Sequence, residues 1–187
     1  MTFYKRYDKK ITEEYSIKTI SNSFNCKYST YYSPDNTDNF DYLSEDKRAA
    51  LEITTVIPQN VIEAYIYDKH HSFGKNNLST MKIKNGKYSD DGAILSYYGG
   101  SMQEIKIGIQ NAIKEKQDIT IKRCENSPIE VVDLCICVQD GNLFDLHSFE
   151  ITFGSFKECI FDNIFFITPS HFIRYNKLTG FEEYEKK

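Results

Sequence analysis

Apolar positions recur at helical spacing in three segments of the chain, at residues 11–24, 59–67 and 101–118. The longest of these begins with Ser101 and Glu104, which form the Ser-x-x-Glu sequence of a capping box. Ile105 and Ile109 lie on its apolar face. Isoleucines at every second position also fit a strand here, but the length and the cap favour a helix.

Other apolar segments have the pattern of strands. Residues 49–57 are rich in β-branched side chains, and Glu52 and Thr54 alternate with apolar or β-branched neighbours. Residues 40–43 precede this run across a polar connection, so the two segments predict a β-hairpin. Continuous apolar runs predict strands that are buried on both faces, and a last short run predicts an edge strand. These strands are expected at 130–139, 161–167 and 172–175.

The order of these elements predicts one α/β domain. Helix, hairpin, helix and two further strands are typical of a mixed β-sheet flanked by helices. A chain of 187 residues has the size of one domain. We assign residues 1–180 to this domain and expect residues 181–187, which are mostly Glu and Lys, to fray.

Composition and charge exclude several classes of protein. Hydrophobic residues make up 40% and charged residues 27% of the chain, which is ordinary globular usage. The net charge of −4 excludes a strongly basic nucleic-acid coat protein, so any nucleic-acid contact must be a local patch. Neither a signal peptide nor a membrane span is visible, so we expect a cytoplasmic protein without membrane contact. The abundance of Asn, Lys and Ile indicates an AT-rich genome, bacterial or phage.

The cysteines predict buried thiols. There are five, without C-x-x-C spacing, which argues against a disulfide framework and a zinc ribbon. Cys135 and Cys137 lie in an apolar run and would share one face of a strand. We predict that both are buried on a central strand, with neither a disulfide nor zinc.

Two carboxylates on the predicted hairpin are the strongest candidates for chemistry. Asp41 and Glu52 can lie side by side on adjacent strands, and Glu52 lies within an otherwise apolar strand. Neighbouring carboxylates repel unless a cation lies between them. Two carboxylates and a backbone carbonyl suit Mg²⁺ or Mn²⁺. The alternative is a purely structural hairpin that nearby Lys47 and Arg48 stabilise.

The hairpin resembles the PD-(D/E)xK, or restriction-endonuclease-like, nuclease superfamily. Its motif has an Asp at a strand start and an acidic-x-Lys tripeptide on the next strand. Asp41 takes the place of the Asp, with Asp35 and Asp38 as alternatives, and Glu52 takes that of the acidic residue. The resemblance covers most of residues 12–167 as a pattern of elements.

Two further features bear on this resemblance. The family often has an acidic residue on the preceding helix, where this chain has Glu13 and Glu14. Thr54 stands where the family has its Lys, which supplies a cation near the attacking water and the phosphate. Some members supply that Lys from the following helix, so Lys114 or Lys116 would take its place, unless both are solvated.

The resemblance implies a metal-dependent nuclease that hydrolyses phosphodiester bonds. Asp41, Glu52 and the carbonyl of Ile53 would bind Mg²⁺ or Mn²⁺. Lys114 or Lys116 would stabilise charge, and Thr54 would orient the water. Glu52→Ala is then expected to abolish cleavage and to leave stability equal or higher. The alternative is a catalytically inactive, protein-binding module, such as a phage-encoded inhibitor or a defence-complex subunit, which the missing Lys and the net negative charge favour.

Other polar positions give weaker signals. The pairs His70 with His71 and His147 with Glu150 fit a loop and a polar surface better than a metal site. Scattered basic residues are candidates for contact with a nucleic-acid backbone. These are Lys82, Lys84, Lys87, Lys106, Lys122 and Arg123.

Overall fold

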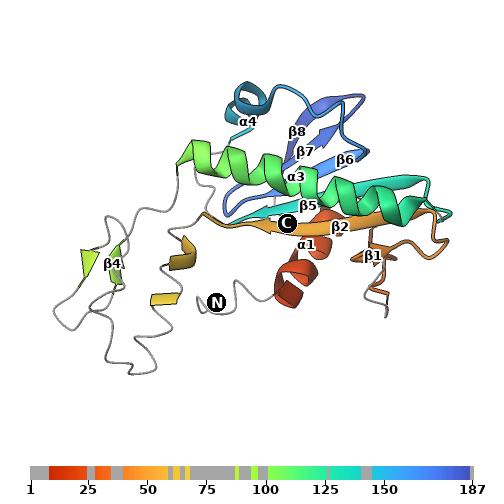
Figure 1. The fold of residues 1–187 in the computed structure, drawn as a ribbon, viewed down its shortest axis with the longest axis horizontal. Helices are drawn as coiled ribbons and strands as arrows, with labels where there is room; N and C mark the ends of the chain where they lie inside the picture. Colours follow the sequence, from red (N-terminus) through yellow and green to blue (C-terminus); the bar gives the residue numbers. More distant parts are fainter. Residues whose placement is uncertain are drawn as a thin grey trace.

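A six-stranded mixed β-sheet forms the centre of the protein (Figure 1). The computed structural model describes residues 9–24, 28–34, 40–58, 61–63, 66–67, 87–88, 94–96, 101–125, 127–139 and 145–185. In spatial order the strands are β1 (Tyr42–Leu43), β2 (Ala49–Val56), β5 (Val131–Val138), β6 (Asn163–Ile167), β7 (Phe172–Asn176) and β8 (Gly180–Tyr184). β3 (Lys87–Tyr88) and β4 (Ile94–Ser96) form a separate antiparallel pair. The expected α/β class is confirmed.

The sheet combines a parallel centre with antiparallel sides. β2, β5 and β6 are parallel, and their connections contain α3 (Met102–Cys124) and α4 (Leu146–Phe153). β1 pairs antiparallel with β2, which confirms the predicted hairpin. β6, β7 and β8 are joined in antiparallel order. β5 therefore lies in the interior of the sheet, where the side chains of residues 132–138, including that of Asp133, are buried.

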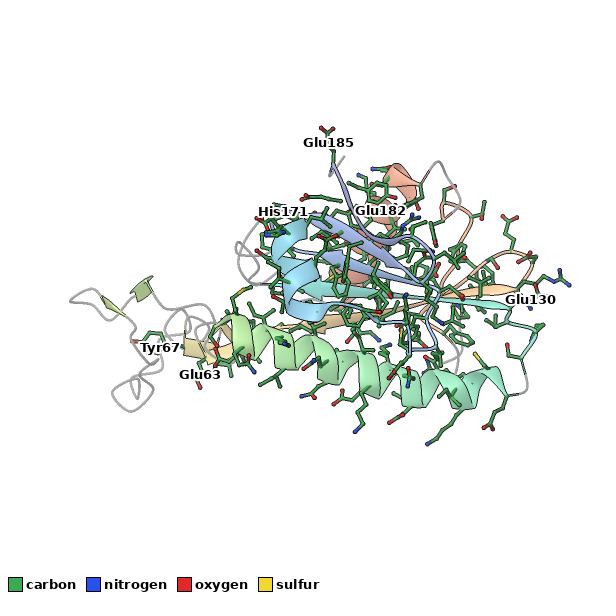
Figure 2. The ribbon with its side chains drawn as sticks, turned by 90° about the horizontal axis from the view of Figure 1, so that it is seen from above. Glu63, Tyr67, Glu130, His171, Glu182 and Glu185 are labelled. Carbon is green, nitrogen blue, oxygen red and sulfur yellow. The ribbon has the colours of Figure 1, made fainter. Side chains whose placement is uncertain are left out.

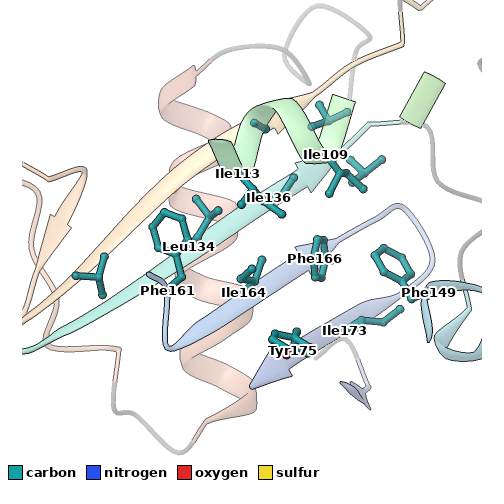
Figure 3. Packing of buried hydrophobic residues seen from close by; sticks show 14 of the residues in the cluster. Ile109, Ile113, Leu134, Ile136, Phe149, Phe161, Ile164, Phe166, Ile173 and Tyr175 are labelled. Atoms are coloured by element: carbon teal, nitrogen blue, oxygen red, sulfur yellow. The ribbon is translucent and has the colours of Figure 1, made fainter. Parts of the chain in front are cut away.

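Helices cover both faces of the sheet. α3 and α4 pack on one face, where Ile109 and Phe149 share a core with Leu134 and Phe166 (Figure 3). α1 (Lys9–Ser23) packs on the other face, where Ile20 joins a second core. Successive β5 side chains enter the two cores in turn, as period-two alternation requires.

Cys135 and Cys137 are buried on the interior strand β5, as predicted, and both lie in the core on the α1 side. Both thiols are buried, and neither forms a disulfide. The hydroxyl of Ser16 on α1 lies 2.9 Å from the sulfur of Cys137. These cysteines therefore act as small core side chains where the first helix meets the sheet.

The turn of the β1–β2 hairpin aligns its two strands. Ser44 bonds to Asp46 and to the backbone of Ala49, and Lys47 adopts a left-handed φ of 57°. The register pairs Tyr42 with Leu51 and Leu43 with Ala50. Extending this register by one residue places Asp41 opposite Glu52.

α3 begins at the predicted cap and runs beyond the predicted end. Ser101 and Glu104 form both bonds of the capping box, and the helix continues to Cys124. Gly108 allows a close approach to β2, because a Cβ at this position would lie 2.7 Å from Cγ1 of Val56. This contact limits how deeply α3 lies on the sheet at the carboxyl end of β2, where Val56 is the last residue.

Two expectations for the end of the chain are wrong. β7 is not an edge strand, and residues 181–184 do not fray, because β8 pairs along β7. The ring centroid of Phe181 lies 4.9 Å from that of Tyr175, and the ring centroid of Tyr184 lies 4.7 Å from that of Phe24. The two aromatic side chains pack against other rings of the protein. The segment nevertheless has a polar sequence, because most of its other residues are Glu or Lys.

The helices within the described ranges are not membrane spans. None of them combines the length and the apolar character that crossing a bilayer requires.

Candidate functional site

Asp41, Glu52 and Lys116 meet at the edge of the sheet. Nζ of Lys116 lies 2.9 Å from Oδ2 of Asp41 and 2.6 Å from Oε2 of Glu52. The Glu52 side chain is 0% exposed, that of Asp41 14% and that of Lys116 19%. The two carboxylates share one face of the hairpin, as predicted, and a single ammonium group bridges them.

A hydrogen bond from the backbone of β2 and the charges of nearby lysines hold the Asp41 carboxylate in place. The backbone N–H of Ile53 donates to Oδ2 of Asp41 at 2.8 Å, and Nζ of Lys9 on α1 lies 3.7 Å from Oδ1. Burial would raise the pKa of Asp41, but the charge of Lys116 and the Ile53 hydrogen bond outweigh it, so the pKa is lowered. Asp41 is therefore ionised at neutral pH.

Glu52 contacts a second cation that sequence reasoning did not assign to it. Nη1 of Arg123 lies 2.5 Å from Oε1 of Glu52, and the guanidinium lies 5.9 Å from the ring centroid of Phe40. Burial raises the pKa of Glu52, and the charge of Lys116 offsets part of this effect. Each carboxylate oxygen of Glu52 thus has its own cationic partner.

One stripe of α3 supplies these cations. Lys116, Thr120 and Arg123 are spaced i, i+4 and i+7, so they lie on the same side of the helix. The i+7 spacing from Lys116 is the sequence signal that could have linked Arg123 to the site. Lys114, the other predicted lysine, is exposed and is not brought to the carboxylates. Of the two predicted lysines, Lys116 contacts the acidic pair, and Arg123 on the same side of α3 contacts Glu52.

A cavity of about 300 Å³ opens beside Lys116. Thr54, at the position where the resemblance expects a lysine, lines this cavity together with Lys9 and Glu13 of α1. Nζ of Lys9 lies 3.3 Å from Glu13, and burial raises the pKa of Glu13. The cavity therefore has polar walls from α1, β2 and α3, whereas Glu14 is exposed.

The charges of the ion-pair network that includes Lys9, Glu13 and Lys116 balance. Three cationic side chains meet three carboxylates, so their formal charges sum to zero. They are Lys9, Lys116, Arg123, Glu13, Asp41 and Glu52. Among the residues that the structure describes, no group of three or more His, Cys, Asp or Glu side chains is arranged to hold a metal ion.

The oxygen donors nevertheless suit a hard divalent cation in type. Asp41 and Glu52 offer carboxylates, and the carbonyl of Ile53 lies on the same strand. The hydroxyl of Thr120 is buried without a hydrogen-bond partner within the described ranges, so an additional polar ligand could satisfy it. A bound ion would compete with Lys116 and Arg123 for Glu52.

One of the two basic residues considered as partners for the acidic pair, Arg48, pairs with a different carboxylate. Arg48 pairs with Glu130 at 3.4 Å. Figure 2 shows Glu130 at one end of the molecule, next to the start of β5. His147 and Glu150 are exposed on α4. Several predicted residues lie outside those whose side chains are described, namely Asp35, Asp38, His70, His71, Lys82, Lys84 and Lys87.

Comparison with known proteins gives no match. No protein-family model, curated protein or solved structure is significantly similar to this chain. Its function must therefore be argued from the geometry of the site.

Proposed function

We propose that this protein is a metal-dependent nuclease with a restriction-endonuclease-like site. The observation that carries the proposal is Lys116, whose ammonium group bridges Asp41 and Glu52. The family pairs two acidic residues with a lysine, and here α3 supplies the lysine while Thr54 occupies its usual position. The element order also supports the proposal, since a helix and a hairpin precede α3 and the buried strand β5.

Each residue has a distinct role in this proposal. A divalent ion held by Asp41, Glu52 and the Ile53 carbonyl would neutralise phosphate charge and activate water. Lys116 would stabilise the negative charge that develops on the scissile phosphate. Thr54 would orient water from the wall of the cavity. Arg123 would be a positioning residue that holds the second oxygen of Glu52.

The two α3 lysines provide the test. Cleavage of single-stranded and duplex DNA and RNA should require Mg²⁺ or Mn²⁺, and Lys116→Met should lower it by at least about 100-fold, the usual scale for a transition-state charge contact. Lys114→Met is the matched control on the same helix and should leave cleavage unchanged. Equal activity of the two variants, or cleavage that persists in EDTA, would contradict the assignment.

A catalytically inactive binding module is the second candidate. The observation that favours it is the contact of Arg123 with Glu52, which helps to neutralise the acidic pair without a metal. Such a protein could act as an inhibitor or as a subunit of a larger complex. Calorimetry with Mn²⁺ separates the candidates, because the nuclease should bind the ion at millimolar concentration or below and the inactive module should not.

A further inference from the structure

A second cavity, also of about 300 Å³, lies beside the one at Lys116. Thr12 of α1 lines both cavities, so both lie against the start of this helix. The second cavity lies at the carboxyl ends of β5 and β6, where Gln139 and Thr168 line it. Ligands of open α/β sheets commonly bind outside the carboxyl ends of strands.

Hydrogen bonds hold the walls of this second cavity in place. The backbone N–H of Gln139 donates to the carbonyl of Val56 at 3.1 Å, which ties the end of β5 to β2. Thr168 and His171 exchange backbone and side-chain hydrogen bonds across the turn that contains Pro169. These hydrogen bonds hold the part of the cavity wall that the ends of β5 and β6 supply.

The lining of this cavity combines an aromatic ring with apolar and neutral polar groups. Tyr15 on α1 is 50% exposed, although it is a large side chain. Ile167 and Pro169 contribute apolar surface, and Gln139 and Thr168 contribute neutral polar groups. None of the described lining residues carries a formal charge, whereas two lysines and one carboxylate, Lys9, Lys116 and Glu13, line the neighbouring cavity.

We propose that the second cavity binds one unstacked nucleobase of a strand whose phosphate lies at Lys9 and Lys116. A planar base stacks on an aromatic ring such as Tyr15, while neutral polar groups can bond to its edge. A base within a duplex is already stacked and paired, so the preferred substrate is single-stranded or frayed nucleic acid. This inference rests on the proposed function, because the nuclease site defines where the phosphate lies.

The test measures binding in EDTA, so that it does not depend on cleavage. Wild type should bind a single-stranded oligothymidylate of about 10 nucleotides more tightly than a duplex of the same length. Tyr15→Ala should weaken single-strand binding by about 10-fold, the scale of one lost base stack. Tyr15→Phe keeps the ring and should bind like wild type, whereas Tyr15→Leu keeps apolar bulk without the ring and should bind like Tyr15→Ala.

Every outcome of this experiment decides the inference. Equal binding by wild type, Tyr15→Ala and Tyr15→Leu would overturn the base subsite, as would absence of single-strand binding or a preference for duplex. A Tyr15 effect in a protein that never cleaves nucleic acid would retain the subsite and reject the nuclease. Metal-dependent cleavage by wild type, together with equal single-strand binding by wild type and Tyr15→Ala in EDTA, would retain the nuclease and reject the subsite.

Discussion

Glu52 is completely buried, and its two oxygens contact Lys116 and Arg123. Burial of a carboxylate is costly, and here two cations offset the cost. From the acidic pair by itself we expected Glu52→Ala to relieve repulsion and to leave stability equal or higher. The structure changes that expectation, because Lys116 already separates the acids and loss of Glu52 would leave two cations partly buried.

We therefore expect Glu52→Ala to lower the free energy of unfolding by roughly 3 kcal/mol, as when one partner of a buried ion pair is removed. Urea unfolding at neutral pH measures this change. Glu130→Ala is the control, since the Glu130 side chain is 60% exposed in its pair with Arg48. It should change stability by less than about 0.5 kcal/mol. If the stability of Glu52→Ala is unchanged or higher, repulsion between Asp41 and Glu52 outweighs the contacts of Glu52 with Lys116 and Arg123.

The residue pattern could predict the acids but not which cations meet them. Asp41 and Glu52 stood out because they lie on two short segments with a recognisable strand pattern. Lys114 and Lys116 are both lysines on α3, and which of them reaches the acids depends on how the helix is rotated over the sheet. That rotation results from packing between residues far apart in sequence, so local periodicity does not determine it.

At the scale of elements, the rotation of α3 over the sheet depends on the contact of this helix with β2. Gly108 lies against Val56, and Lys116 follows eight residues later, about 12 Å along the helix axis at 1.5 Å per residue. A small error in the depth or rotation of α3 would move the Lys116 ammonium away from the acids. Gly108 is thus a structural residue on which the site depends.

We expect Gly108→Ala to destabilise the protein, although Ala normally stabilises a helix by about 1 kcal/mol relative to Gly. The added methyl group would lie 2.7 Å from Cγ1 of Val56, a stiff β-branched side chain, so α3 or β2 must shift. Thermal unfolding measures the effect. Asn111→Ala, at an exposed position of α3, should leave the melting temperature equal or raise it.

The double variant Gly108→Ala with Val56→Ala tests the cause. The double variant should lose less stability than the sum of the losses in the two single variants, because the two side chains would no longer collide. Additive losses would show that the close approach is not the reason for a glycine at this position.

Elements with strong local signals could be predicted well. The capping box located the start of α3, and the continuous apolar run identified β5 as a buried strand. The last strand could not be recognised, since most residues between 181 and 187 are charged. Its stability comes from pairing with β7 and from two aromatic contacts, both of which require the folded protein.

At the scale of the whole molecule, the segment expected to be a frayed tail is the last strand of the sheet, β8, which pairs with β7. β7 contains the buried side chains Phe172 and Tyr175, and β8 protects their strand on its outer side. Arg174 and Glu182 form an ion pair across the two strands. An uncovered β7 would present a hydrophobic edge that favours aggregation.

We expect a chain that ends at Thr179 to be much less stable and to aggregate, because it lacks β8. Thermal unfolding and size-exclusion chromatography measure the two effects. A chain that lacks Lys186 and Lys187 is the control and should behave like wild type. A stable monomer that ends at Thr179 would show that β8 contributes little to the fold.

The bridge between Lys116 and the acids has a consequence for the protein as it is synthesised. Lys116 follows Asp41 by 75 positions and Glu52 by 64, so the hairpin leaves the ribosome well before its cation. Until α3 has emerged and docked, the two carboxylates face each other without that partner. In the proposed nuclease, chemistry that needs all three residues would therefore be absent from the nascent chain while that chain lies beside the messenger RNA and the ribosomal RNA.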